Sequence, residues 1–256
     1  MNRLNIIHSV LMACALAISA CGTSPWNQEQ ADSHINVGAA FLGSGRSNDA
    51  LKEFLEAEKL SPQDPKIHYY MGISYLDKGL NDNAIAEFKK ALSLKPDYSE
   101  AHNFLGVIYR DKKQWDMAID EFKNALANVL YETPDKAVFN MGTAYDGKGE
   151  YDKALKMYEE AKNKQPHTIP APVIDLYIGR TYYAQGNLEK AVSYFKASLK
   201  TAPSLLESHY WLGQCYIKLH EPAKARAEFK TIIDITPDSG LGIEAKKSLD
   251  SMTSSR

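Results

Sequence analysis

The chain has 256 residues, 44% of them apolar, and carries 30 Lys and Arg against 32 Asp and Glu, a formal net charge of −2. This balance is ordinary for a protein in water and offers no excess of positive charge for holding a nucleic acid. We therefore expect no nucleic acid among the partners, which would be selected by shape and local chemistry.

The first 20 residues have the three parts of an export signal. Asn2 and Arg3 form a short basic region, residues 10–20 form an apolar stretch, and small residues precede Cys21. The apolar stretch is about half as long as the roughly 20 residues that a transmembrane helix needs. We therefore predict a signal peptide at 1–20 that is removed, with Cys21 as the first residue of the mature chain.

The segment Ile18-Ser19-Ala20-Cys21 resembles the bacterial lipobox. The resemblance implies that Cys21 is acylated and anchors the chain in the outer membrane, facing the periplasm. Gly22 follows the cysteine, where Asp would signal retention in the inner membrane. A plain secretory signal with an incidental cysteine is one alternative. A second site ending at Cys14 is another, but it would leave an apolar region only about one or two turns long.

Two further predictions follow from an acylated N-terminus. Residues 21–30 would be the lipidated cysteine and a polar tether of at most roughly 20–30 Å. Cys215 would be the remaining thiol of the mature chain, and its helical apolar surroundings predict a small buried core residue.

A glycine recurs at intervals of about 34 residues through the rest of the chain. Each copy reads aliphatic residue, Gly, two variable residues and an aromatic residue, as in "LGVIY" at 105–109. An Ala followed four residues later by Phe or Tyr recurs in every copy, and a Pro closes five copies. The glycines are at 38, 72, 106, 142, 179 and 213, the alanines at 50, 84, 118, 154, 191 and 225, and the prolines at 62, 96, 166, 203 and 237.

This pattern is similar to the tetratricopeptide repeat, a unit of two antiparallel helices. The residues account for the spacing as well, because Gly106 and Ala118 are small enough to let the two helices approach. The resemblance implies an all-α, right-handed superhelical solenoid of six repeats with a C-terminal capping helix. The expected domains are 1–20 and 21–30 as above, repeats at 31–64, 65–98, 99–134, 135–171, 172–205 and 206–239, and a cap and tail at 240–256.

Glycine is also expected at the turn inside each helix pair, where a left-handed residue ends the first helix. Four repeats have glycine there, at 45, 79, 149 and 186. Lys113 and His220 take this position in the third and sixth repeats, so residue type predicts the turn less strongly there.

Four histidines, at 34, 68, 102 and 209, share the fourth position of their repeats and raise the question of a metal site. Neighbouring helices lie about 8–10 Å apart, whereas zinc needs each nitrogen at about 2.0–2.1 Å. We therefore predict that these histidines pack and hold no metal. The sequence "GSG" at 43–45 lacks the strand, Lys and helix of a phosphate loop. We expect no enzyme, cofactor or small-molecule substrate, with an enzyme built on a cryptic histidine site as the remote alternative.

In tetratricopeptide proteins the first helices line a concave groove that binds protein segments. Applied here, the groove is mixed aromatic, aliphatic and amide with few charges, which favours an extended or helical ligand with apolar anchors. It lacks the Lys, Asn and Arg pattern of relatives that hold a C-terminal carboxylate. The alternative is that several of these residues pack between repeats. The groove residues are Tyr69, Ile73, Leu76, Asn103, Val107, Arg110, Phe139, Thr143, Leu176, Arg180, Tyr183, Tyr210 and Ile217.

The link after the third repeat is extended by two residues. Its Tyr131-Glu-Thr-Pro134 and the following Asn140-Met-Gly142 resemble the outer-membrane lipoproteins that assist type IV pilus biogenesis. An aromatic-Leu-Cys stretch expected of that family is absent, since the third repeat reads "FLGVIYR". A drifted loop is the alternative interpretation of the link.

This resemblance implies a pilotin, which binds secretin subunits or other pilus assembly proteins and helps them reach or assemble in the outer membrane. The rival function is a general periplasm-facing adaptor for β-barrel assembly, cell-wall remodelling or polysaccharide export.

Overall fold

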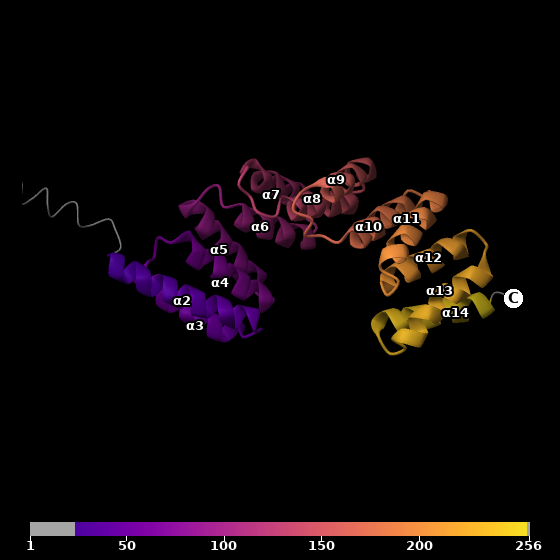
Figure 1. The fold of residues 1–256 in the computed structure, drawn as a ribbon, viewed down its shortest axis with the longest axis horizontal. Helices are drawn as coiled ribbons and strands as arrows, with labels where there is room; N and C mark the ends of the chain where they lie inside the picture. Colours follow the sequence, from indigo (N-terminus) through magenta and orange to yellow (C-terminus); the bar gives the residue numbers. More distant parts are fainter. Residues whose placement is uncertain (1–23, 255–256) are drawn as a thin grey trace, which may run out of the picture. The chain divides into compact units, whose positions relative to one another are not determined.

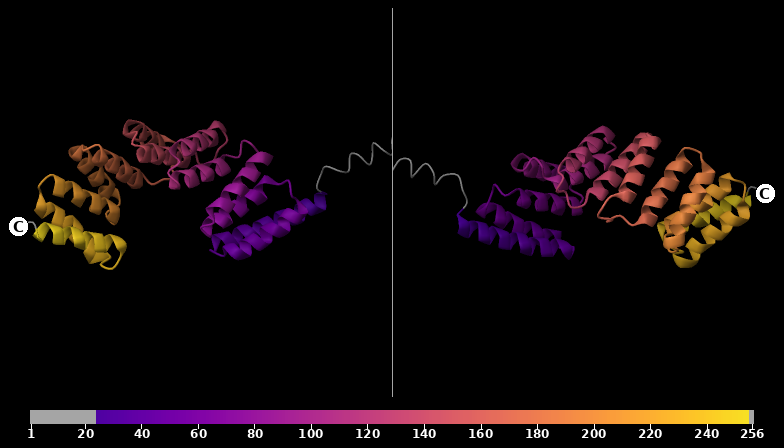
Figure 2. Two further views of the ribbon diagram at one scale, coloured as in Figure 1. Left: turned by 180° about the vertical axis from the view of Figure 1, so that it is seen from behind. Right: turned by 45° about the horizontal axis from the view of Figure 1, so that its top comes forward.

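A computed structural model describes residues 24–254, and this range consists of helices and their links, with no strand (Figure 1). Helices α2 to α13 pair into six antiparallel hairpins, and α14 follows them, as the predicted all-α repeat solenoid requires. Two further views show each hairpin as two neighbouring helices (Figure 2). The helices are α2 (Pro25–Gly43), α3 (Ser47–Leu60), α4 (Pro65–Asp77), α5 (Asn81–Leu94), α6 (Ser99–Asp111), α7 (Trp115–Ala127), α8 (Pro134–Lys148), α9 (Tyr151–Asn163), α10 (Ala171–Ala184), α11 (Leu188–Thr201), α12 (Leu206–Lys218), α13 (Pro222–Ile235) and α14 (Gly240–Ser254).

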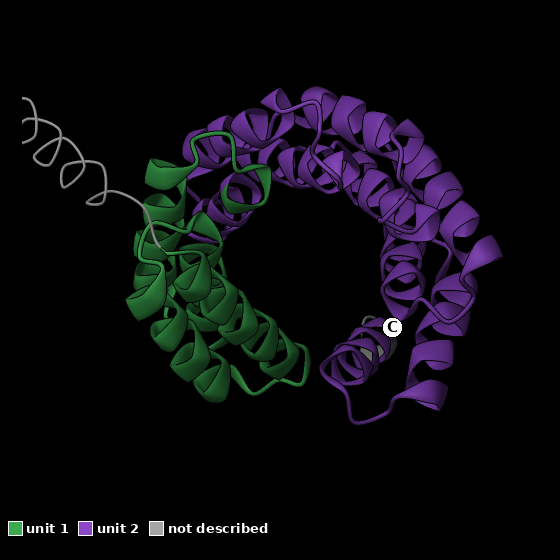
Figure 3. Ribbon diagram, turned by 60° about the vertical axis from the view of Figure 1, so that its left-hand side comes forward, with its two compact units in different colours: residues 1–101 green, residues 102–256 purple. Residues whose placement is uncertain are grey.

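The chain divides into two compact units, residues 1–101 and 102–256 (Figure 3). The border falls in the first turn of α6. In unit 1, residues from α2, α3 and α4 enclose a core around Phe54 and Ile67, both fully buried. Unit 2 is a curved double layer of helices with its core distributed along the stack. Each unit therefore buries its apolar side chains between successive hairpins, as expected of repeats that cannot fold alone.

The recurring glycines are explained by one contact that is repeated in every hairpin. A Cβ atom added to Gly106 would lie 2.5 Å from the ring of Phe122, which is fully buried on the second helix. Because the glycine has no side chain, the aromatic ring packs directly on the first helix. Burying such a ring contributes about 1.5–3 kcal/mol. The other pairs are Gly38–Phe54, Gly72–Phe88, Gly142–Tyr158, Gly179–Phe195 and Gly213–Phe229.

All six turns inside the hairpins are left-handed. The four glycines have φ of 70, 71, 82 and 78°, and Lys113 and His220 both have φ of 58°. Gln114 N donates to Tyr109 O at 2.8 Å, which matches the bond from Glu150 N to Tyr145 O at 2.9 Å in a glycine-containing turn. The turns at Lys113 and His220 are therefore formed like the others, because the backbone bonds that close them are kept.

The first helix begins earlier than expected. We predicted a tether over 21–30, but α2 starts at Pro25, so residues 25–30 are helical. Ser24 caps the helix by accepting a hydrogen bond from Asn27 N at 3.2 Å, and proline is favourable at the first helical position. Gln28 then fastens this turn, because it accepts from Ser61 Oγ at 2.8 Å. Cys21 and the predicted signal peptide lie outside the described residues.

The chain ends on α14, which covers the last hairpin. Ala245 is buried, and Leu241, Leu249 and Met252 pack against the core formed with α12 and α13. The helix lies within the cap and tail expected at 240–256. Among the described helices, none combines the length and apolar character needed to cross a bilayer.

Candidate peptide-binding surface

The expected groove residues all lie on first helices of hairpins. Three of them are on α4 in unit 1, and the others are on α6, α8, α10 and α12 in unit 2. Within unit 2, α10 contacts α12, the first helix of the next hairpin, and α12 contacts the capping helix α14. Side chains from successive hairpins therefore meet on this layer, and a surface that spans several repeats is formed.

Ten of the thirteen expected residues are partly exposed, and three are buried. The exposed fractions of Asn103, Phe139 and Leu176 are 9%, 8% and 5%. The Phe139 ring packs against those of Tyr158 and Tyr177, with centroids 5.5 and 4.9 Å apart. All three occupy the fifth position of their repeats, and they contribute to packing between repeats. Tyr69 and Tyr210, at the same position, remain partly exposed.

In unit 1 the surface is aromatic. The Tyr69 ring lies 5.2 Å from that of Tyr70 and 4.9 Å from that of Tyr98, measured between centroids. Lys95 Nζ lies 4.7 Å above the Tyr98 ring. Burial raises the pKa of Tyr98 well above its usual value, so its hydroxyl stays neutral. This part offers apolar and hydroxyl contacts.

A polar network joins α6 to α8 in unit 2. Arg110 Nη1 donates to Asn140 Oδ1 at 3.4 Å and to Thr143 Oγ1 at 3.3 Å. Its Nε and Nη2 donate to Asp111 Oδ1 at 3.0 and 2.8 Å. Asn140 Nδ2 in turn donates to Asn103 Oδ1 at 3.1 Å. The Arg110 guanidinium is thus held by residues of its own unit, and Asn140 is a surface residue that the repeat pattern did not identify.

Further along unit 2, two cations alternate with aromatic rings. Arg180 Cζ lies 5.1 Å from the centroid of Tyr177 and 5.3 Å from that of Trp211. The Trp211 ring meets the Tyr183 ring edge to face at 5.2 Å, and Lys218 Nζ lies 4.0 Å above the Tyr183 ring. We call these five residues the aromatic-cation strip. Tyr177, Trp211 and Lys218 were not among the expected groove residues.

An open pocket of about 300 Å³ lies beside the strip. A Cβ atom on Gly147 would lie 2.6 Å from the Trp115 ring, so the glycine lets this ring pack directly against α8. Asp146 accepts a hydrogen bond from Thr181 Oγ1 at 2.8 Å. Burial raises the pKa of Asp146, while that bond and Arg180 oppose the shift. The pocket is lined by Arg110, Asp111, Trp115, Thr143, Asp146, Gly147, Tyr177 and Arg180.

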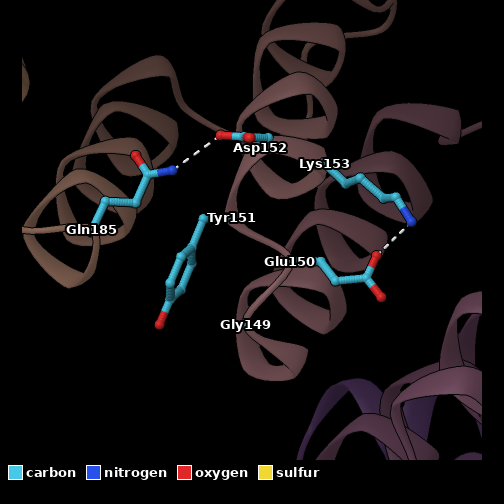
Figure 4. Close-up of a pocket in the computed structure, with 6 residues that line it drawn as sticks. All are labelled: Gly149, Glu150, Tyr151, Asp152, Lys153 and Gln185. Carbon is cyan, nitrogen blue, oxygen red and sulfur yellow. Dashed lines mark hydrogen bonds and ion pairs between the residues drawn. The ribbon is translucent and has the colours of Figure 1, made fainter.

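A second pocket lies at the turn between α8 and α9 (Figure 4). Gln185 Nε2 donates to Asp152 Oδ1 at 3.0 Å, and Lys153 pairs with Glu150 at 2.5 Å. Because its polar side chains bind one another, this pocket offers less to a ligand than the strip does.

The four histidines at the fourth position each contact a glutamate 19 residues later, on the second helix of the same hairpin. The distances from Nδ1 to carboxylate oxygen are between 2.6 and 2.8 Å. Nε2 of His68 and Nε2 of His209 also face a backbone carbonyl. In the described part of the chain, no group of three or more His, Cys, Asp or Glu is arranged to hold a metal ion. The histidines thus connect helices. The pairs are His34–Glu53, His68–Glu87, His102–Glu121 and His209–Glu228.

Cys215 is a free, fully buried thiol, as the sequence predicts. Burial raises its pKa to about 12, so the reactive thiolate is suppressed.

The long link between α7 and α8 has a buried part and an exposed part. Tyr131 is 7% exposed and packs against Ala125 and Ala137. Val129 and Leu130, just before it, are 95% and 82% exposed. Asn128 shapes this turn, since its Oδ1 accepts from Leu130 N at 2.9 Å. The link is therefore a formed turn fixed by Tyr131.

Three family models match parts of the chain. Tetratricopeptide repeat models match residues 182–246 and 137–167, and a model described as regulator of microtubule dynamics protein 1-3 matches residues 42–103. Among curated proteins, the human protein O-mannosyl-transferase TMTC2 is 24% identical over 103 residues, which are 40% of this chain. That match spans 12% of the length of TMTC2, so it concerns a small part of the human protein.

Two solved structures resemble the chain over most of its length. PilW, described as a widely conserved type IV pilus biogenesis factor, superposes with a TM-score of 0.77 at 21% identity, covering 84% of this chain and 97% of PilW. Pseudomonas aeruginosa PilF superposes with a TM-score of 0.72 at 16% identity, covering 87% of this chain and 99% of PilF. At these identities the likeness concerns the fold. Tetratricopeptide repeat models thus match two stretches of the chain, and its helical repeats have the fold of PilF and PilW.

Proposed function

We propose that this protein is a non-enzymatic scaffold, anchored through lipid on Cys21 to the periplasmic side of the outer membrane, that assists type IV pilus biogenesis as a pilotin. It binds secretin subunits and helps them reach or assemble in the membrane. The observation that carries the proposal is the extent of the structural match, which takes in 97% of PilW and 99% of PilF. If the proteins shared only the repeat unit, arrays with different numbers of repeats would match over only part of one chain.

The surface of the repeats supports a role in binding protein. Aromatic side chains lie partly exposed on first helices in both units, including Tyr69 in unit 1 and Tyr183 and Trp211 in unit 2. Such rings provide large contact areas with little loss of side-chain entropy on binding. The helical framework behind them is fixed by the repeated contacts between glycine and aromatic residues. A stiff frame with accessible aromatic groups suits the reversible capture of a protein segment.

The anchor is the second part of the mechanism. Each buried methylene of an acyl chain contributes about 0.8 kcal/mol to membrane binding, so several chains make release negligible. The lipobox-like Ile18-Ser19-Ala20-Cys21 supports this part. A client bound to the repeats would then be held at the membrane surface, where a secretin must assemble.

Deletion of the gene tests the proposal, with surface pili counted by electron microscopy. We expect pili to be lost and to return when the unaltered chain is supplied. A Cys21→Ala chain should fail to take up labelled palmitate and should restore few pili. Normal piliation in the deletion strain would contradict the pilus role. A defect in barrel insertion, wall remodelling or polysaccharide export in that strain would instead support the general adaptor function.

A further inference from the structure

We propose that the aromatic-cation strip of unit 2 binds an extended client segment carrying two acidic side chains, which pair with Arg180 and Lys218. The proposal rests on the proposed function in one respect, namely that the ligand is a protein segment. It adds the charge of that segment. The sequence predicts a groove of mainly apolar and amide character, and this prediction does not include acidic side chains in the ligand.

Arg180 is prepared to bind a carboxylate. The Tyr177 and Trp211 rings occupy the space around its guanidinium, at 5.1 and 5.3 Å from Cζ. Yet the Arg180 guanidinium makes no hydrogen bond or ion pair with any residue that the structure describes, and the residue is partly exposed. Aromatic contacts restrict a guanidinium without using its five N–H donors, which match the two oxygens of a carboxylate. The donors are therefore held in place and remain available.

Lys218 repeats this arrangement at the end of α12. Its ammonium lies 4.0 Å above the Tyr183 ring and is exposed, and within residues 24–254 it forms no ion pair. Contact with the ring favours one position of a long side chain that would otherwise move freely. A second acidic side chain of the ligand would find its partner here.

Three other cations of unit 2 are already neutralised. Arg110 is bound to Asp111, and Lys148 lies 2.5 Å from Asp116. Lys162 forms an ion pair with Asp175 at 2.7 Å. Arg180 and Lys218 differ from these three cations, because neither is paired with an acid among the residues that the structure describes.

Asp146 is the acid whose charge acts on Arg180, but it does not form an ion pair with it. Its Oδ1 accepts from Thr181 Oγ1, and burial disfavours its charged form. Asp146 therefore leaves the Arg180 donors open to an anion from outside.

Because the Trp211 and Tyr183 rings separate Arg180 from Lys218, each cation can pair with a different anion. A single C-terminal carboxylate would reach one of them, whereas side chains on the same face of an extended segment recur about every 7 Å. The Trp211 and Tyr183 rings between the cations provide apolar surface for the rest of the segment. For this reason we assign the site to acidic side chains rather than to a chain terminus.

The test uses the purified full chain and short fluorescein-labelled peptides whose C-termini are amidated. One peptide alternates Glu with Leu, and its partner has Gln in place of each Glu. We expect the Glu peptide to bind at least about tenfold more tightly at low salt, and this advantage to shrink as salt is added. Equal affinity of the two peptides would overturn the proposal, as would binding that requires a free C-terminus.

Reversing the charge of single residues tests whether the peptide binds at the aromatic-cation strip. Arg180→Glu and Lys218→Glu should each weaken binding of the Glu peptide by about fivefold and should improve binding of a peptide that alternates Lys with Leu. Lys190→Glu is the matched control, since Lys190 lies 4.9 Å above the Tyr182 ring but on the second helix α11. Equal loss in the Lys190 variant would overturn the assignment. Should a variant not fold, the comparison of Glu and Gln peptides on the unaltered chain still decides.

The two proposals fail separately. Loss of pili in the deletion strain together with equal affinity for Glu and Gln peptides would retain the pilus role and reject the acidic ligand. Normal piliation together with selective, Arg180-dependent binding of the Glu peptide would reject the pilus role and support the acidic ligand.

Discussion

Asp135 Oδ2 accepts hydrogen bonds from both the backbone N–H and the hydroxyl of Thr168, each at 2.6 Å. The carboxylate is fully buried in the first turn of α8 and also accepts from Ile169 N at 3.0 Å. The link between α9 and α10 is thereby fastened to the start of α8. A negative charge is also favourable at a helix N-terminus.

Replacing Asp135 should therefore release this link. Asp135→Ala removes the acceptor of three hydrogen bonds, so we expect the free energy of unfolding to fall by about 3 kcal/mol. Asp135→Asn keeps one acceptor oxygen and should lose about half as much. Urea unfolding measures the loss, and hydrogen exchange at the Thr168 amide reports the link itself. Unchanged protection of that amide in the Ala variant would show that the carboxylate does not hold the link.

The pH dependence of stability should reveal the histidine contacts. His209 Nδ1 lies 2.6 Å from Glu228 Oε2, and its Nε2 lies 3.0 Å from Pro203 O. Both partners are acceptors, so both nitrogens must carry protons, as they do in imidazolium. The hydrogen bond to Glu228 raises the pKa of His209, against burial, with a smaller contribution from the Pro203 carbonyl.

A raised pKa means that the folded state binds the proton more tightly than the unfolded state. The stabilisation is complete below the unfolded pKa of about 6.5 and is lost as pH rises through the folded pKa above it. His209→Gln should therefore cost more stability at pH 6 than at pH 9, as measured by urea unfolding. NMR titration should place the pKa of His209 above 6.5, and Glu228→Gln should lower it. An equal cost of His209→Gln at both pH values would contradict this account.

The contacts between glycine and aromatic residues predict a sharp contrast between two glycines. A Cβ on Gly179 would lie 2.6 Å from the Phe195 ring, whereas nothing lies within 4 Å of one on Gly43. Gly179→Ala should destabilise by about 1–3 kcal/mol, because the ring must move away from the helix. Gly43→Ala, also in a helix, should be neutral or slightly stabilising. Similar unfolding midpoints for the two variants would argue against direct packing of the ring on the helix.

The link between α7 and α8 predicts opposite sensitivities for neighbouring residues. Tyr131→Ala removes a buried ring and should cost about 2–4 kcal/mol. Val129→Ser and Leu130→Ser alter exposed side chains and should change stability by less than about 0.5 kcal/mol. Thermal unfolding of the three variants checks this. A large loss from Val129→Ser or Leu130→Ser would mean that these side chains contribute to the fold.

The hairpins and their inner contacts could be predicted from the sequence because their spacing is repeated. Each glycine stands at a fixed distance from the aromatic residue that covers it, as Gly106 does from Phe122. The left-handed turns at Lys113 and His220 could not be predicted with equal certainty, because residue type alone disfavours them. The early start of α2 depends on Ser24 and on contacts from Gln28 to the next hairpin, which are not part of the repeat.

The surface was less predictable than the core. The repeat pattern places position five in the groove, but Asn103, Phe139 and Leu176 turn inward at this position. The missed residues Tyr177 and Trp211 each follow position five directly. Whether the residue at position five or the next residue reaches the surface depends on the volume of side chains in the adjacent repeat. That volume is a property of the tertiary structure. No repeating signal in the sequence identifies the strip, although its high aromatic content could have drawn attention to it.

The most direct test of the pilotin proposal is the assembly state of the secretin. We predict that SDS-resistant secretin multimers fall sharply in membranes of the deletion strain, that the unaltered chain restores them, and that the Cys21→Ala chain does not. Normal amounts of multimer in the deletion strain, with the secretin itself expressed at its usual level, would contradict the account.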